Sequence, residues 1–318
     1  MADLNALHHF TSPYPLPDGF IAYDPIYAHP LPEGHRFPMM KYELIPEALI
    51  YEGLATPNDF FSPPELDETI ILWTHDEDYW QRMKTLQLTD REMRAIGFPL
   101  SAGLVARERR IARGTIDCAQ YALAHKSVAL NVAGGTHHAF ANRGEGFCLL
   151  NDFAIAANYL LHTGQASSIL IVDLDVHQGN GTAALFEQEQ QVFTFSMHGQ
   201  HNYPFRKETS DLDVGLADGI SGKEYLQLLE ETLPPLLDRI QPDIVFYLAG
   251  VDVLATDKYG KLKLSLADCY ARDHFVFTEC KKRNLPVTVS MGGGYSPKLA
   301  DIVTAHTGTY RAAIDVYR

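Results

Sequence analysis

Residues 169–177 read ILIVDLDVH, and this stretch decides the fold class that we expect. Its first four residues are apolar and mostly β-branched, which is typical of a strand covered on both faces of a sheet. The last five alternate between polar and apolar side chains. Asp175 and His177 are two positions apart at the expected strand end, so both side chains point to the same side. A buried strand that ends this way indicates an α/β protein with a site at the edge of its sheet.

Similar apolar runs recur along the chain, with helical patterns between them. We expect strands at Thr69–Trp73, Val128–Val132, Ile169–Asp173, Val192–Met197, Ile244–Leu248 and Val287–Met291. We expect helices at Leu104–His125, Asp152–His162, Lys223–Ile240 (interrupted by Pro234 and Pro235) and Leu266–Arg283. This alternation predicts one mostly parallel sheet with helices on both faces. No repeat or long linker divides residues 1–318, so we expect a single domain.

Composition narrows the class of partner. Lys and Arg number 26 and Asp and Glu number 40, which gives a net charge of −14. This balance disfavours nucleic acid as a partner and would mildly attract cationic substrates. The 4 cysteines show no paired spacing, the segment MADLNALHHF does not resemble a signal peptide, and no apolar run could span a membrane. We therefore expect a cytoplasmic protein with reduced thiols and no membrane partner.

Five of the expected strands end in polar or glycine-rich segments. In parallel sheets, ligands bind beyond the carboxyl ends of the strands, so these segments should meet at one edge. They are residues 134–138 (GGTHH), 173–177 (DLDVH), 196–199 (SMHG), 250–257 (GVDVLATD) and 292–295 (GGGY).

Asp175 and His177 are candidate metal ligands. A catalytic zinc site needs a third protein ligand and an open position, and Asp252 and Asp257 are both candidates for it. Two carboxylates and one imidazole also suit Fe²⁺ or Co²⁺. Taken alone, an Asp and a His two residues apart are more often an ordinary ion pair at a strand end. The other polar strand ends favour the metal site.

The histidine pair and the glycine-rich end supply candidate catalytic groups. His137 or His138 beside a metal-bound water would be a natural general base, although a surface His-His pair is the commoner case in isolation. Tyr295 follows three glycines and could donate its hydroxyl to an oxyanion, or could simply pack in a tight turn. Phe147 is either core or the wall of a pocket for an aliphatic chain.

Taken together, these motifs resemble the histone deacetylase superfamily. The resemblance rests on GGTHHAF (134–140), GEGFCLLND (144–152), DLDVHQGNGT (173–182), AGVDVLATD (249–257) and GGGY (292–295), which stand in the family's order and spacing. The segments around HQGNGT and HNYPF look most like class IV members and their bacterial relatives. The resemblance implies the arginase/deacetylase fold, with a central sheet of about eight strands.

The resemblance also implies roles for individual residues. Asp175, His177 and Asp257 match the zinc ligands. His138 matches the general base and Tyr295 the oxyanion-stabilising tyrosine. The remaining matches are to supporting positions: His137 and its orienting acid Asp173, Asn180 behind His138, the substrate contacts Gly146, Phe147 and Gly293, and a structural potassium site made by Asp173, Asp175, His177, Ser196 and Met197.

The implied activity is zinc-dependent hydrolysis of the amide of an acylated amine, with acyl-lysine as the expected substrate. The alternatives are hydrolysis of an acetylpolyamine or another small amide, and an inactive module that binds acyl-lysine. An arginase-type reaction is disfavoured because the two-metal aspartate motifs are missing. Three features depart from the family pattern. Asn180 stands where some members have Asp, residues 94–99 offer no Asp to clamp a peptide, and Arg36 only loosely matches an arginine below the active site.

Overall fold

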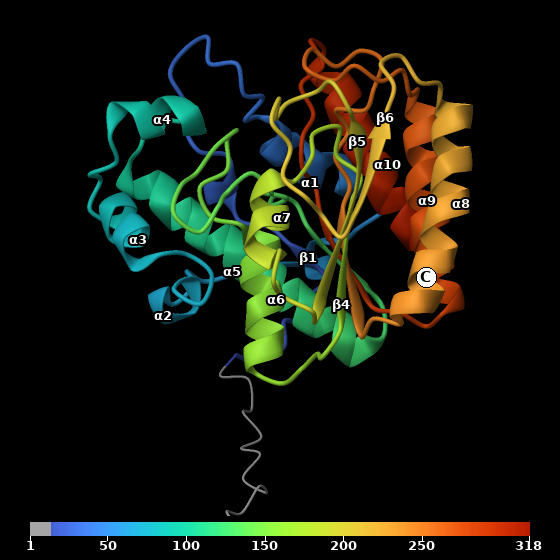
Figure 1. Cartoon of the computed structure of the whole chain (residues 1–318), viewed down its shortest axis with the longest axis horizontal. Coiled ribbons are helices and arrows are strands. Elements are labelled where there is room, and N and C mark those ends of the chain that lie inside the picture. The colour runs from blue at the N-terminus through green and yellow to red at the C-terminus, as the bar shows by residue number, and fades with distance from the viewer. Residues whose placement is uncertain (1–13) are drawn as a thin grey trace, which may run out of the picture.

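The structure, a computed structural model, describes residues 14–318. The segment MADLNALHHF, which carries the expectation about a signal peptide, lies outside the described residues. One sheet of 8 strands runs through the molecule in the order β2-β1-β3-β8-β7-β4-β5-β6, and every neighbouring pair is parallel (Figure 1). The strands are β1 (Ile21–Ala22), β2 (Phe60–Phe61), β3 (Val128–Asn131), β4 (Ile169–Asp173), β5 (Val192–Gly199), β6 (Leu212–Leu216), β7 (Ile244–Leu248) and β8 (Val287–Ser290).

Helices cover both faces of this sheet. They are α1 (Lys41–Tyr51), α2 (Glu68–Ile71), α3 (Glu77–Lys84), α4 (Asp90–Ile96), α5 (Ala102–His125), α6 (Asp152–His162), α7 (Asn180–Phe186), α8 (Gly222–Ile240), α9 (Leu266–Lys282) and α10 (Leu299–Tyr317), with short 3₁₀ turns at Pro25–Tyr27 and Pro57–Asp59. Figure 1 shows α5, α6 and α7 on one side of the strands and α8, α9 and α10 on the other. None of the helices described between residues 14 and 318 combines the length and apolarity needed to cross a membrane.

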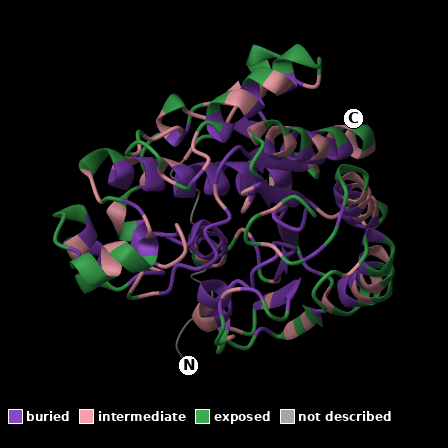
Figure 2. Ribbon diagram, turned by 90° about the horizontal axis from the view of Figure 1, so that it is seen from above, coloured by how far each residue is buried: buried purple, intermediate pink, exposed green. Residues whose placement is uncertain are grey.

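Burial explains the apolar runs in the sequence. Strands β3, β4, β7 and β8 are buried at every residue, because helices cover them on both faces. The edge strand β6 instead alternates between exposed and covered positions. Figure 2 shows the same arrangement, with buried strands at the centre and exposed residues on the outer helices. The predicted parallel sheet is confirmed, and its parallel strands bring their carboxyl ends to one edge.

Two expectations about elements are wrong. The run Thr69–Trp73 is not a strand, because α2 occupies Glu68–Ile71, and Asp67 caps it by accepting a hydrogen bond from the Thr69 N–H. The helix α8 is not interrupted, since it continues through Pro234 and Pro235 to Ile240. Three of its leucines, Leu229, Leu233 and Leu237, lie buried on one face, and this packing outweighs the loss of two backbone donors.

Candidate active site

The segments that follow the strands line one cavity of about 490 Å³. This volume is in the usual range for a site that binds a small molecule or a long side chain. Four of the five strand-end segments predicted to meet line this cavity, whereas residues 196–199 do not. Their residues that line it include Gly134, Gly135, His137, His138, Asp175, His177, Asp252, Gly292, Gly293 and Tyr295, joined by Gly146 and Phe147.

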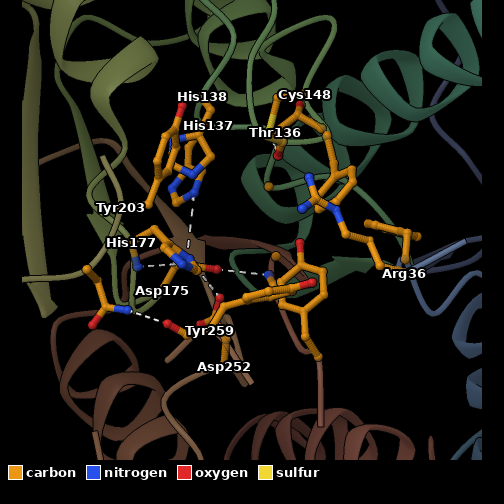
Figure 3. Close-up of a pocket in the computed structure, with 18 of the residues that line it drawn as sticks. Arg36, Thr136, His137, His138, Cys148, Asp175, His177, Tyr203, Asp252 and Tyr259 are labelled. Atoms are coloured by element: carbon orange, nitrogen blue, oxygen red, sulfur yellow. Dashed lines mark hydrogen bonds and ion pairs between the residues drawn. The ribbon is translucent and has the colours of Figure 1, made fainter. Parts of the chain in front are cut away.

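Asp175, His177 and Asp252 form the candidate metal centre at the floor of this cavity (Figure 3). One donor atom from each lies within 4.8 Å of the others. The Nδ1 atom of His177 is 3.0 Å from Asp175 Oδ1 and 3.1 Å from Asp252 Oδ2. All three side chains are buried, so few water molecules can solvate the two carboxylate charges.

The expected third ligand, Asp257, stays a prediction beside Asp252. Its Oδ1 accepts hydrogen bonds from the N–H groups of Tyr259 and Gly260, and its Oδ2 accepts one of 2.6 Å from the Tyr295 N–H. Asp252 is the aspartate close behind the end of β7, whereas Asp257 lies farther along the loop and stabilises a turn there. The motif AGVDVLATD offers two aspartates: the resemblance implies Asp257, whereas the spacing of the donor atoms favours Asp252.

The charges at the floor fit a bound cation. Burial and the neighbouring Asp175 raise the pKa of Asp252 to about 7. The contacts with Asp175 and Asp252 outweigh burial and raise the pKa of His177 to about 10. Two buried carboxylates that face one imidazole therefore need a positive charge between them, which a proton or a metal ion can supply. One nitrogen and two oxygen donors suit a divalent transition metal, zinc included.

His137 and His138 lie side by side above this centre, each held by one partner. Their ring centroids are 4.1 Å apart. The Nδ1 atom of His137 is 2.7 Å from Asp173 Oδ2, and the Nδ1 atom of His138 is 2.6 Å from Asn180 Oδ1. The structure thus places Asp173 and Asn180 in contact with the two histidines, as the resemblance implied.

The pKa values of the two histidines are shifted in opposite directions. An amide oxygen only accepts hydrogen bonds, so His138 carries its proton on Nδ1 and leaves Nε2 with a lone pair. Burial, together with His137 and His177, lowers the pKa of His138 well below its usual value. For His137, burial opposes the charged form, but the Asp173 carboxylate outweighs it and raises the pKa. Such divergence within a pair is typical of acid–base assignments in active sites.

Tyr295 and Phe147 line the cavity together, with ring centroids 5.9 Å apart. Burial and the nearby carboxylates of Asp252 and Asp175 raise the pKa of Tyr295 well above its usual value, so its hydroxyl remains a donor. Opposite Phe147, the ring of Tyr203 packs edge-on against His138, with the centroids 5.0 Å apart. Two aromatic walls thus lead down to the histidines.

Glycine is required at two of the expected substrate contacts. Gly146 has a φ of +53°, and a Cβ there would lie 2.8 Å from the His138 ring, so a larger residue would displace the candidate base. A Cβ on Gly293 would lie 2.0 Å from Asp252 Oδ2. The Gly293 N–H donates to Asp175 Oδ2, and its carbonyl accepts from the Val251 N–H. Gly293 therefore also positions the candidate ligand carboxylates, and its expected role as a substrate contact stays a prediction.

The expected potassium site stays a prediction. Asp173 on β4 pairs in register with Ser196 on β5, which brings together two of the residues expected to hold the ion. The Asp173 Oδ1 accepts from the Asp175 N–H, however, and the Ser196 hydroxyl lies 2.9 Å from His198 Nδ1.

The sequence reasoning missed two side chains that shape the site. Lys41 is fully buried beneath the glycine loop, where its Nζ donates to the Gly292 carbonyl and burial lowers its pKa to about 8. Tyr203 belongs to the HNYPF segment, which resembles class IV members but carries no residue predicted for the site. Arg36 does not lie below the site, because it is exposed and lines both the cavity and an adjoining surface groove.

Comparisons with known proteins identify the family. Residues 35–310 match the family described as "Histone deacetylase domain". The chain belongs to the histone deacetylase family. It is 45% identical over 297 residues to an uncharacterized protein of Picosynechococcus, covering 93% of this chain and 99% of that one. It is 30% identical over 279 residues to Histone deacetylase 2 of Arabidopsis thaliana, covering 85% of this chain and 72% of the relative.

A solved structure supports the fold. The crystal structure of the HDA15 HD domain superposes with a TM-score of 0.77 and covers 92% of this chain and 89% of its own, at 21% sequence identity. The arginase/deacetylase fold expected from the sequence is therefore confirmed. Family membership makes the protein a relative of deacetylases that hydrolyse amides.

Proposed function

We propose that residues 1–318 form one catalytic domain that hydrolyses the amide of an acylated amine, with acyl-lysine as the substrate. Zinc would be held by Asp175 and His177, with Asp257, which the resemblance implies, or Asp252, whose donor atom lies within 4.8 Å of theirs, as the third ligand. The same donor types would accept Fe²⁺ or Co²⁺. The observation that carries the proposal is the joint placement of these donors, a neutral histidine and a protonated tyrosine around one cavity. A divalent ion at this centre supplies positive charge that polarises a carbonyl and acidifies water.

His138 is the group that moves protons. Its Nε2 lone pair accepts a proton from the attacking water, because Nδ1–H is already donated to Asn180. The same Nε2 then gives that proton to the departing amine nitrogen. His137, whose charged form Asp173 favours, would stabilise the negative charge that develops beside it.

The remaining residues hold and surround the substrate. The Tyr295 hydroxyl donates to the oxyanion of the tetrahedral intermediate. Phe147 and Tyr203 bind the aliphatic chain of the amine and exclude water around it. The Gly146 carbonyl would accept the substrate N–H, and Lys41 steadies the loop that carries Tyr295.

The test is hydrolysis of a fluorogenic acetyl-lysine amide by the purified protein, with the metal content measured. Activity should vanish on chelation and return with zinc. Tyr295→Phe should lower kcat by about 10²–10³-fold, because only the oxyanion donor is lost. The change in KM should be much smaller. A kcat within about threefold of wild type at full metal occupancy would remove Tyr295 from the mechanism.

Two alternatives give different outcomes in the same assay. A binding module would retain acetyl-lysine peptide and metal but release no acetate. An acetylpolyamine hydrolase would prefer small cationic amides to acetyl-lysine. We also propose a cytoplasmic location, because all 4 cysteines are free and buried, and a structural potassium ion at Asp173 and Ser196.

A further inference from the structure

The mouth of the cavity carries a charge opposite to that of the whole protein. The net charge of the chain is −14. Among the described residues that line the cavity, those that are both exposed and charged are Arg36 and Lys261, and both are basic. The two acids of the lining, Asp175 and Asp252, lie buried at the floor and face the candidate metal centre.

Arg36 is the unpaired cation of this mouth. Its guanidinium carbon lies 5.0 Å from the centroid of the Phe147 ring and 6.0 Å from that of Tyr259. Figure 3 shows its side chain reaching toward the cavity from the side opposite Tyr203. No ion pair or side-chain hydrogen bond within residues 14–318 involves Arg36. The aromatic rings therefore hold the guanidinium in place while its N–H groups stay free.

The acids near the mouth already have partners. Asp218 lies 3.7 Å from Lys261 Nζ and 3.3 Å from His201 Nδ1. Glu145 accepts hydrogen bonds of 2.8 Å from Arg143 Nε and from the Tyr203 hydroxyl. These contacts reduce the negative charge that could attract a cationic substrate. Arg36 has no such partner in the described part of the chain, so its positive charge is available to bind an anionic group of the substrate.

We propose that the site prefers acylated amines whose amine component carries a carboxylate, and that Arg36 binds this carboxylate. The inference rests on the proposed function, because that function directs the acyl end to His138 and the amine end out past Phe147. A substrate chain that leaves along Phe147 passes the guanidinium stacked on that ring. A planar guanidinium can donate two parallel hydrogen bonds to a carboxylate. An acylated polyamine would instead bring like charge to Arg36, which disfavours it.

The carboxylate could come from two sources. One is the α-carboxylate of a free Nε-acyl-lysine, and the other is an acidic residue next to acyl-lysine in a peptide. The first pair of test compounds is Nα-capped Nε-acetyl-lysine as the free acid and as the amide. The second is a capped peptide with Glu, or with Gln, on both sides of acetyl-lysine. An N-acetylated diamine serves as the cationic comparison.

The variant is Arg36→Gln, and the matched control is Arg239→Gln. Arg239 is also exposed and also stacks on a phenylalanine, with its guanidinium carbon 5.1 Å from the Phe193 ring, but it does not line the cavity. For the wild type we expect kcat/KM to be about fivefold higher for the acidic member of at least one pair, as an exposed ion pair allows. Arg36→Gln should bring that ratio close to one, and Arg239→Gln should leave it unchanged. Added salt should also reduce the ratio in the wild type.

Calorimetric binding of the same pairs to metal-loaded protein separates this inference from the proposed function. Hydrolysis of both members at equal rates, or an unchanged ratio in Arg36→Gln, would overturn the inference and leave the function standing. A preference for the diamine would overturn the inference and favour the acetylpolyamine alternative. If metal-loaded protein hydrolyses no compound, the proposed function fails. In that case, tighter binding of the acidic member of a pair, lost in Arg36→Gln, would still support carboxylate binding by Arg36. Equal binding of the acidic and neutral members would overturn the inference.

Discussion

His137 and His138 show at the scale of single residues how a neighbour assigns a chemical role. The two rings share one cavity and differ mainly in the group behind Nδ1. A carboxylate behind His137 favours its charged form, whereas an amide behind His138 does not compensate for burial. The base is therefore free of its Nε2 proton at the pH where the reaction must run.

This argument predicts the effect of Asn180→Asp on the pH dependence of kcat/KM. The base must be neutral to act, so the acidic limb of the profile follows the pKa of His138. A carboxylate beside Nδ1 favours the imidazolium and should move that limb to higher pH by about one unit or more. Activity on the acidic side should fall, and the plateau should be reached at a higher pH.

The matched control is Asn142→Asp, which adds the same charge at an exposed position near the cavity loops without contacting His138. Its pH profile should shift much less, because exposed charge is screened. An acidic limb that stays in place in Asn180→Asp would mean that Asn180 does not set the pKa of His138.

At the scale of elements, helix α9 holds the two strand ends that carry the candidate ligands. Its Arg272 is fully buried, and its Nη1 donates to the carbonyls of Gly250 (2.7 Å) and Leu174 (3.2 Å). Leu174 directly precedes Asp175, and Gly250 stands two residues before Asp252. Asp273 fixes the guanidinium by accepting from Nε at 2.7 Å. Arg272 is thus a positioning residue that acts through the backbone of both ligand loops.

Arg272→Met should therefore weaken zinc binding, although no ligand is changed. It leaves two carbonyls without this donor and removes the cation paired with Asp273, and loss of such supporting groups typically costs about 10–100-fold in metal affinity. The control is Arg113→Met, which breaks a similarly buried pair with Asp117 on α5. Both variants should be less stable, but only Arg272→Met should raise the dissociation constant for zinc. Equal zinc affinity in the two variants would reduce Arg272 to a structural residue.

The helices and strands differ in how closely the sequence predicts their type and position. Strands β4 and β7 coincide with the predicted runs because burial on both faces requires an apolar stretch. Strands β1 and β2 have 2 residues each, and they pair through residues distant in the chain, so no local pattern marks them. The run at Thr69–Trp73 begins in a helical turn although its pattern predicts a strand, because a short apolar stretch fits either structure.

At the scale of the whole molecule, the candidate site is assembled from parts that the sequence keeps far apart. The motifs predicted Asp175, His177, His138 and Tyr295 at one edge, because parallel strands align their ends. The motif with two aspartates offers two third ligands: the resemblance implies Asp257, and the donor spacing favours Asp252. Lys41 and Arg36 lie in a segment without a recognisable motif, so the sequence does not predict them at the site. They reach it because that segment packs against the glycine loop and the cavity.

The same assembly ties the stability of the molecule to metal. Asp175 and Asp252 lie in the segments that follow β4 and β7, so a cation between them links the ends of these two neighbouring strands in the folded state only. Zinc at about 100 times its dissociation constant should then raise the free energy of unfolding by about 2.7 kcal/mol. Thermal unfolding with zinc and with chelator measures this gain. Asp252→Asn should lose it, whereas Asp257→Asn should retain it while weakening the turn at Tyr259 and Gly260. If Asp257→Asn loses the zinc-dependent gain and Asp252→Asn keeps it, Asp257 is the third ligand.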